Sequence, residues 1–251
     1  MKIIACYSNK GGVGKTATAV NLAHALASTG QRTLLCDLDP QGASSFYFRI
    51  KPSKKLSDKA FFTDVARFTK SIRASDFDNL DILPANMGFR DFDVFLARMR
   101  NSRSRLKKAL RAVKNDYDVI LLDCPPNIST LSENVFRTSD GIVVPVIPTT
   151  LSQRTFEQLQ DFFRENGLPI KKLHAFFSMV QGVKSLHGDT INEMRKSYGK
   201  RLMTSQIPFA SEIERMGVNR APVIESAPRS AAAKAYQALN AEIQQRMAKL
   251  G

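Results

Sequence analysis

Residues 8–16 read Ser-Asn-Lys-Gly-Gly-Val-Gly-Lys-Thr, a glycine-rich segment that carries two lysines. The related pattern G-x-x-x-x-G-K-[ST] binds phosphate groups, because backbone N–H groups of its turn surround them. In that pattern the lysine reaches the β- and γ-phosphates, and the hydroxyl is a ligand of Mg²⁺. Lys15 and Thr16 occupy those two positions, whereas Asn9 replaces the first glycine and Lys10 is an additional cation. We therefore expect an altered phosphate-binding loop whose nucleotide contacts come from Gly11, Gly12, Val13, Gly14, Lys15, Thr16 and Ala17.

Three aspartates follow apolar runs that are typical of buried strands. Asp37 and Asp39 stand on either side of a leucine after the run 34–36, and Asp123 follows the run 119–122. The carboxyl ends of parallel strands line the ligand crevice of an open α/β sheet, so both runs would deliver carboxylates to one place. Alternation along a continuing strand would point Asp37 and Asp39 to the same side. Asp123 fits the second acidic motif of phosphate-loop enzymes, whose carboxylate supports Mg²⁺.

The elements that must position these residues alternate between strands and helices. Apolar runs predict strands near 2–7, 32–36, 79–83, 117–122, 141–146 and 172–179. Helical spacing of apolar residues predicts helices over 14–29, 88–115 with a break near 101–104, 152–166 and 229–249. This order predicts an α/β fold of the P-loop type, with a mostly parallel, twisted sheet covered by helices on both faces. We expect a single domain over 1–251, within which 42–116 holds a basic helical elaboration.

Composition limits the class of protein. At 251 residues with 43% hydrophobic content, the chain can bury a sizeable core. No apolar run approaches the roughly 20 residues that cross a bilayer, and a strand begins too early for a secretory signal. The three cysteines are far apart and form no C-x-x-C pair, so we expect buried, reduced thiols. These observations favour a cytoplasmic protein without a membrane partner.

Charge is the unusual property of this chain. The formal net charge is +14, and the segment 98–114 holds eight basic residues and no acidic one. A second segment, 49–73, holds eight basic residues against Asp58 and Asp64. An excess of this size attracts polyanions, with nucleic acid the leading candidate. Solvated helix faces remain the alternative explanation.

Five segments together resemble a known family. They are KGGVGKT (10–16), DLDPQG (37–42), NLDILPA (79–85), YDVILLDCPP (117–126) and a late run with IP, APV, PRS and AY (207–236). In this order and spacing they are similar to the ParA/MinD family of deviant phosphate-loop ATPases, and most closely to its ParA branch. The resemblance covers nearly the whole chain.

The resemblance implies the roles of the loop residues. Lys10 matches the family's signature lysine, which reaches across a dimer interface to the partner subunit's nucleotide. Lys15 and Thr16 keep the ordinary roles toward phosphate and Mg²⁺, and Asp39 matches the aspartate that positions or activates the attacking water. The implied catalytic residues are Asp39, Lys10 and Lys15.

The resemblance also implies the ligands and partners. ATP with Mg²⁺ is the expected cofactor pair, with Thr16, Asp37 and Asp123 at the metal and Pro208 and Phe209 against adenine. ATP would join two subunits into a sandwich homodimer that binds DNA non-specifically and positions a cargo over the nucleoid. Because no arginine finger is identifiable in the chain, hydrolysis should be slow until a ParB-like or cargo-adaptor protein stimulates it.

The DNA surface is the point where the chain departs from its family. Two arginines that contact DNA in chromosomal relatives align with Val183 and Glu212. The surface is therefore rebuilt from neighbouring positions or moved to the basic segment 98–114. The neighbouring basic residues are Lys184, Arg195, Lys196, Lys200, Arg201, Arg215 and Arg220.

Three rival functions share the same core motifs. A MinD-like membrane switch would need a basic amphipathic tail, whereas the last helix carries only a narrow apolar stripe: Tyr236, Leu239, Ile243, Met247 and Leu250. An iron–sulfur carrier would need a cysteine pair. An ATP-dependent ligase of the dethiobiotin synthetase type would keep the loop without a role for Lys10 or for DNA.

Overall fold

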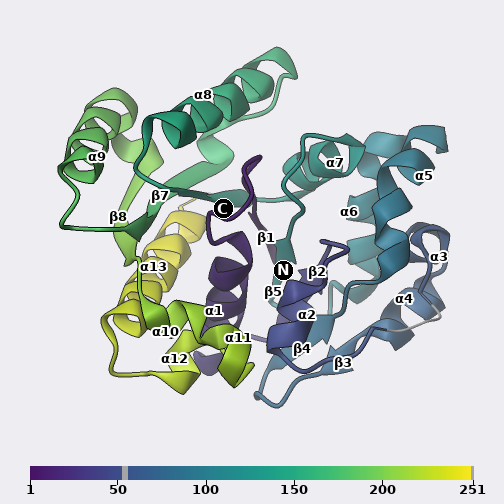
Figure 1. The fold of residues 1–251 in the computed structure, drawn as a ribbon. Helices are drawn as coiled ribbons and strands as arrows, with labels where there is room; N and C mark the ends of the chain where they lie inside the picture. Colours follow the sequence, from purple (N-terminus) through teal and green to yellow (C-terminus); the bar gives the residue numbers. More distant parts are fainter. Residues whose placement is uncertain (53–55, 250–251) are drawn as a thin grey trace.

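A computed structural model describes residues 1–52 and 56–249 and shows a sheet of eight strands with helices on both faces (Figure 1). The strand order is β3-β4-β2-β5-β1-β6-β7-β8, and every neighbouring pair is parallel except β3 with β4. The predicted α/β class is confirmed. The strands are β1 (Lys2–Cys6), β2 (Thr33–Asp37), β3 (Arg73–Ala74), β4 (Leu80–Leu83), β5 (Val119–Asp123), β6 (Gly141–Val146), β7 (Leu173–Val180) and β8 (Leu202–Pro208).

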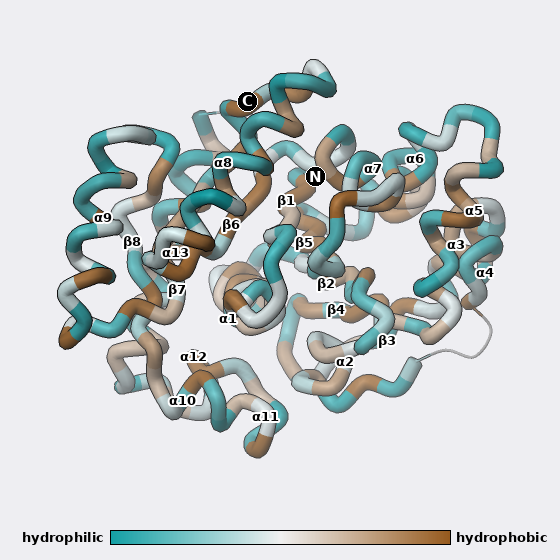
Figure 2. The backbone as a smooth tube through the Cα atoms, turned by 45° about the horizontal axis from the view of Figure 1, so that its top comes forward, coloured by the Kyte–Doolittle hydropathy of each residue, from teal (hydrophilic) through white to brown (hydrophobic). Residues whose placement is uncertain are grey.

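Two apolar layers hold the helices to the sheet. In β1, Ile3 and Ala5 join one layer, while Ile4 and Cys6 join the other, as the two-residue period of a strand requires. The Ile4 layer packs under α1 (Lys15–Ser28), α2 (Ala43–Tyr47), α12 (Val223–Ser226) and α13 (Ala231–Ala248). The Ile3 layer packs under α3 (Asp58–Thr63), α4 (Val65–Ser71), α5 (Phe92–Arg98), α6 (Arg105–Leu110), α7 (Thr130–Thr138), α8 (Thr150–Glu165) and α9 (Ser185–Tyr198). Figure 2 shows the hydrophobic colour along the central strands and hydrophilic stretches on the outer helices.

The segment predicted as a helix over 88–115 consists of several short pieces. The expected break is present, because Asn101 adopts a left-handed conformation with a φ of 58° between α5 and α6. Short 3-10 turns lie at Met87–Asp91, Ser102–Ser104 and Arg111–Val113. The phenylalanines that precede this segment have a structural role, since Phe61 packs against the rings of Phe89 and Phe92.

Strand β8 and helices α7 and α9 were not predicted from the sequence, nor was the short strand β3. Two further short helices, α10 (Ser211–Glu214) and α11 (Met216–Asn219), follow β8. Strand β8 is an edge strand whose register against β7 is interrupted twice. The carboxylate of Glu242 on α13 accepts hydrogen bonds from the backbone N–H groups of Thr204 (2.9 Å) and Ser205 (3.0 Å) in β8.

The last helix, α13, belongs to the core. Tyr236, Leu239, Ile243 and Met247 are buried, and α13 packs against α1 and β8. Leu250, the last member of the predicted stripe, lies outside the described residues. The apolar stripe is therefore a docking face within the protein. Across the described ranges, no helix has the length and apolar character needed to cross a membrane.

Candidate active site

The glycine-rich loop lies between β1 and α1, at the carboxyl edge of the sheet (Figure 1). Gly12 and Gly14 have φ values of 69° and 88°, which L side chains rarely adopt. Gly14 begins α1 without a side-chain cap, and the first turn of the helix has no acidic residue. The N–H groups and the positive dipole end of α1 are therefore free to bind an anion.

Lys15 is the buried cation of this loop. Lys15 is 7% exposed, and its Nζ donates a hydrogen bond of 3.2 Å to the carbonyl oxygen of Lys10. Burial lowers the pKa of Lys15, whereas the carboxylates of Asp123 and Asp39 oppose that shift. An ammonium held in this way gains from a phosphate, because the phosphate would replace the hydration that burial removes.

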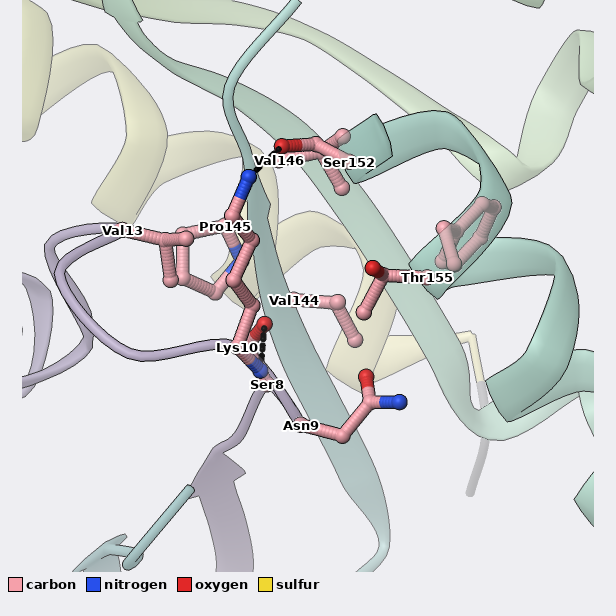
Figure 3. A pocket seen from close by; sticks show the side chains of 10 residues that line it. Ser8, Asn9, Lys10, Val13, Val144, Pro145, Val146, Ser152 and Thr155 are labelled. Carbon is pink, nitrogen blue, oxygen red and sulfur yellow. Dashed lines mark hydrogen bonds between the residues drawn. The ribbon is translucent and has the colours of Figure 1, made fainter. Parts of the chain in front are cut away.

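Lys10 points away from its own loop. Its Nζ donates a hydrogen bond of 3.0 Å to Oγ of Ser152, in the first turn of α8. Figure 3 shows the lysine against a crevice formed by β6 residues Val144 and Pro145 and by Thr155 of α8. The two lysines of the loop therefore occupy separate places: Lys15 within the loop and Lys10 beside α8.

Two aspartates stand side by side at the ends of β2 and β5. Asp37 and Asp123 are register partners, and both are fully buried. Ser45 donates to Oδ2 of Asp37 from its backbone N–H (2.8 Å) and its hydroxyl (2.6 Å), and the hydroxyl of Ser44 donates to Oδ2 of Asp123 (2.6 Å). Burial raises the pKa of both carboxyl groups, and for Asp37 the charge of Asp123 adds to this. The pair gains from a nearby cation.

Asp39 is placed differently from the prediction. Strand β2 ends at Asp37, so the alternation expected to carry Asp39 to the same side of a continuing strand does not apply. The carboxylate of Asp39 accepts a hydrogen bond of 3.0 Å from the N–H of Gln41, within a turn closed by the N–H of Gly42 on the carbonyl of Asp39. Asp39 is only partly buried, and its charge still acts on Lys15 and Asp123.

The residues present suit Mg²⁺ carried by a nucleotide. The Oδ1 atoms of Asp37 and Asp123 are buried, and neither has a hydrogen-bond partner in the described part of the chain. The side chain of Thr16 lowers the pKa of the Asp123 carboxyl group, against the effect of burial. Within the same residues no group of three or more His, Cys, Asp or Glu side chains could hold a metal. That combination fits Mg²⁺, which prefers one or two carboxylates together with substrate phosphates and water.

The remaining predicted residues lie at the same edge of the sheet or in its core. Pro208 ends β8 and Phe209, which is 48% exposed, follows it with its N–H bonded to the carbonyl of Val180 (3.0 Å). Their contact with adenine stays a prediction. The thiols are buried and free, as expected, and burial raises the pKa of each: Cys6, Cys36 and Cys124.

Sequence reasoning missed the serines that hold the charged residues. Ser44 and Ser45 come one residue after the acidic segment 37–42, and this pair of small hydroxyl residues was the available signal. Ser152 lies 142 residues from Lys10, so no local pattern joins the two. Ser178 was also missed, because it is distant in sequence from the loop that it contacts. Its Oγ lies 3.0 Å from the position that a Cβ would occupy at Gly14.

Comparison with known proteins agrees with this geometry. The family described as an AAA domain matches residues 1–172. The chain is 34% identical to the sporulation initiation inhibitor protein Soj of Bacillus subtilis, over 96% of this chain and 98% of that protein. It is 29% identical to the chromosome partitioning protein ParA of Myxococcus xanthus, over 97% of this chain and 88% of the relative.

A solved structure shares the fold. Cobyrinic acid a,c-diamide synthase from Mycobacterium smegmatis, with bound ADP and magnesium, superposes with a TM-score of 0.80 at 24% identity and covers 98% of this chain and 94% of its own. At that identity the likeness shows the fold alone. Together with the loop, the acidic pair and the full-length relatives, it leads to one conclusion: the chain belongs to the ParA/MinD family of P-loop ATPases and is an ATP hydrolase.

Proposed function

We propose that this protein is a ParA-type ATPase that forms a sandwich homodimer on binding ATP, binds DNA non-specifically and positions or segregates a cargo. The observation that carries the proposal is the separation of the two loop lysines. Lys15 stays within its own loop, whereas Lys10 rests against Ser152 beside α8. A cation directed away from its own phosphate site is placed to reach the phosphates of a second subunit.

The edge that carries Lys10 also has apolar side chains that suit a second copy of the chain. Ile128, after β5, is 43% exposed, and Leu151, after β6, is 69% exposed. Both strands flank β1, which leads into the loop. Exposed apolar groups on both sides of a charged site favour a protein interface there. In the proposed dimer, the γ-phosphate offsets the repulsion between Lys10 and the partner's Lys15.

The proposed chemistry divides among a few residues. Lys15 and the backbone of 11–17 hold the phosphates, with Thr16, Asp37 and Asp123 toward Mg²⁺. When bound, Mg²⁺ would neutralise charge on the β- and γ-phosphates. Asp39 positions the attacking water and accepts its proton. Loss of the γ-phosphate removes the attraction that joins the subunits, so nucleotide state controls association.

The proposed partners follow from charge and from the incomplete site. A net charge of +14 favours non-specific binding to the nucleoid in the cytoplasm. We assign no arginine of this chain to the transition state, so hydrolysis is slow until a ParB-like or cargo-adaptor protein completes the site. The whole chain, 1–251, acts as one ATPase unit whose segment 42–116 is an elaboration.

DNA binding in defined nucleotide states tests the proposal. Wild type, Lys10→Ala and Asp39→Ala are compared with ADP, ATP and a non-hydrolysable ATP analogue. We expect wild type to bind DNA with ATP or the analogue and weakly with ADP. Asp39→Ala should remain a DNA-bound dimer in ATP because hydrolysis no longer releases it, and Lys10→Ala should lose dimerisation or DNA binding. Equal binding of wild type in ADP and ATP contradicts the proposal.

A further inference from the structure

Exposed cations line α6 and the turns on either side of it. We call this surface the basic ridge and define it as Arg98, Arg100, Lys107, Lys108, Arg111 and Lys114. All six side chains are exposed, and no acidic residue occurs between Arg98 and Lys114. The ridge plays no part in the nucleotide site described above.

Buried residues of the same segment keep the basic ridge at the surface of the protein. Leu106, Leu110 and Val113 are buried in the core layer beneath α6, so the opposite side of the helix faces solvent. Lys107 lies in α6, Arg111 begins the 3-10 turn that follows the helix, and Lys114 comes directly after that turn. The buried residues therefore hold the backbone that carries these cations, and the cations themselves extend into solvent.

The charges of the ridge are unpaired. No ion pair involves any of its six members within the residues that the structure describes. The positive region continues toward α7, where Lys172 donates to the carbonyl oxygens of Phe136 and Arg137. Burial lowers the pKa of Lys172, and the charges of Lys107 and Arg137 lower it further, against Asp140. Cations that repel one another in this way gain free energy when a polyanion covers them.

The alternative surface, around α9, has less free charge. The segment 184–201 contains five basic and two acidic residues. The short helix α10 adds Glu212 and Glu214. Two of the basic side chains there are already used: Arg195 donates to the carbonyl of Thr204, and Arg201 donates to Gln160. Figures 1 and 2 place α6 and α9 at opposite sides of the molecule, so the two surfaces are separate.

We propose that the basic ridge is the principal surface through which the ATP-bound protein binds the phosphate backbone of DNA. This inference rests on the proposed function and locates its DNA surface. Non-specific binding requires exposed cations that release counterions from the phosphates, and it requires no base contacts. The ridge supplies six exposed cations that form no ion pair in the described part of the chain and have no acidic residue between them in the sequence. At the α9 surface, Asp189 and Glu193 lie among the cations.

A pair of charge-matched variants tests the location. The first combines Lys107→Gln, Arg111→Gln and Lys114→Gln in the ridge, and the control combines Lys184→Gln, Lys196→Gln and Lys200→Gln at α9. Binding of duplex DNA is measured over a salt series with the non-hydrolysable ATP analogue, alongside ATP turnover, dimerisation and thermal unfolding. The ridge variant should lose about 10-fold or more in affinity, and its slope of log K against log salt should fall by about 2 to 3, because each lost phosphate contact removes about 0.9. The control should keep most of the wild-type slope.

The other outcomes separate this inference from the proposed function. If the control loses the slope and the ridge variant keeps it, or if both lose it equally, the location is wrong while ATP-dependent DNA binding stands. If wild type binds no DNA in any nucleotide state, the proposed function fails and the inference falls with it. If the ridge variant keeps DNA binding but loses binding to vesicles of anionic lipid, the ridge serves a membrane surface and the inference is overturned.

Discussion

The ammonium group of Lys10 donates a 3.0 Å hydrogen bond to Oγ of Ser152. Ser152 is 4% exposed and lies in the first turn of α8, and that turn contains no acidic residue. The positive end of the helix dipole opposes a cation at this position, so a single neutral acceptor holds Lys10 there. A contact of this kind fixes the lysine in a defined place and yields readily to a phosphate.

Changing that acceptor should change dimer formation. In Ser152→Asp, Lys10 gains an ion pair within its own subunit, and we expect ATP-dependent dimer affinity to fall about five-fold or more, since such pairs contribute about 1 kcal/mol. An acidic residue in the first turn of a helix is favourable, so folding should be preserved. Sedimentation velocity with the non-hydrolysable analogue measures the effect. Thr155→Ala, in the same crevice, is the control, and wild-type association of Ser152→Asp would refute the role given to this contact.

Nucleotide binding by the monomer should depend on Lys15 and not on Lys10. Lys15→Ala removes the buried ammonium beside the loop, and we expect the affinity for ATP to fall by about 100-fold, as loss of a charged hydrogen bond of about 3 kcal/mol implies. Lys10→Ala should bind nucleotide nearly as wild type when the protein is dilute. Fluorescent nucleotide titration distinguishes the two variants. Equal losses would mean that both lysines serve the same site.

Gly14 should tolerate no side chain. Its φ is 88°, and a Cβ would lie 3.0 Å from Oγ of Ser178. We expect Gly14→Ala to lower the free energy of unfolding by about 1–2 kcal/mol through backbone strain and to weaken nucleotide binding. Adding Ser178→Gly should recover only the part caused by crowding. Gly11→Ala serves as a stability control because open space surrounds that position. Equal melting temperatures for the two single variants would contradict this prediction.

Stability should decrease on mild acidification because of His174 in β7. Burial lowers the pKa of His174 from 6.5 to about 4. The charge of Arg246 adds to this shift, and the charge of Glu242 opposes it. As pH falls, the histidine of the unfolded chain binds a proton before that of the folded protein, and this favours unfolding. The stability that neutral His174 contributes is therefore complete above pH 6.5 and is lost as pH falls through 4. His174→Leu should remove this component, which amounts to about 3 kcal/mol between neutral pH and pH values below the folded-state pKa. Urea unfolding over a pH series measures it, and parallel profiles for wild type and variant would exclude it.

The sequence predicted the central strands because each is a short, buried apolar run between turn signals. It did not predict β8, in which Thr204, Ser205 and Gln206 interrupt the apolar pattern as befits a strand at the edge of the sheet. Helix α9 was missed because only a few of its side chains, such as Ile191 and Met194, are buried. The spacing of apolar residues indicates which side chains are buried, and elements at the periphery of the fold have few buried side chains.

The site was predictable where its chemistry is local and not where it depends on the fold. The loop motif predicted Lys15 and Thr16 at the start of a helix, and the strand ends predicted Asp37 and Asp123 close together, and the structure places them so. Their roles stay predictions. The hydrogen bonds from Ser44 and Ser45 to the two carboxylates depend on how α2 packs, and the strand ending before Asp39 depends on the turn that follows. Contacts between distant segments leave no pattern in the sequence of either one.

Glu242 gives the outer edge of the sheet a further property. An edge strand with free N–H groups can recruit a strand from another molecule and begin aggregation. In β8 the N–H groups of Thr204 and Ser205 are already bonded to the Glu242 carboxylate, and the ladder with β7 is irregular at the same place. The irregular, capped edge is thus a poor template for intermolecular pairing. Copies of the protein can therefore reach a high local concentration without their sheets joining at this edge.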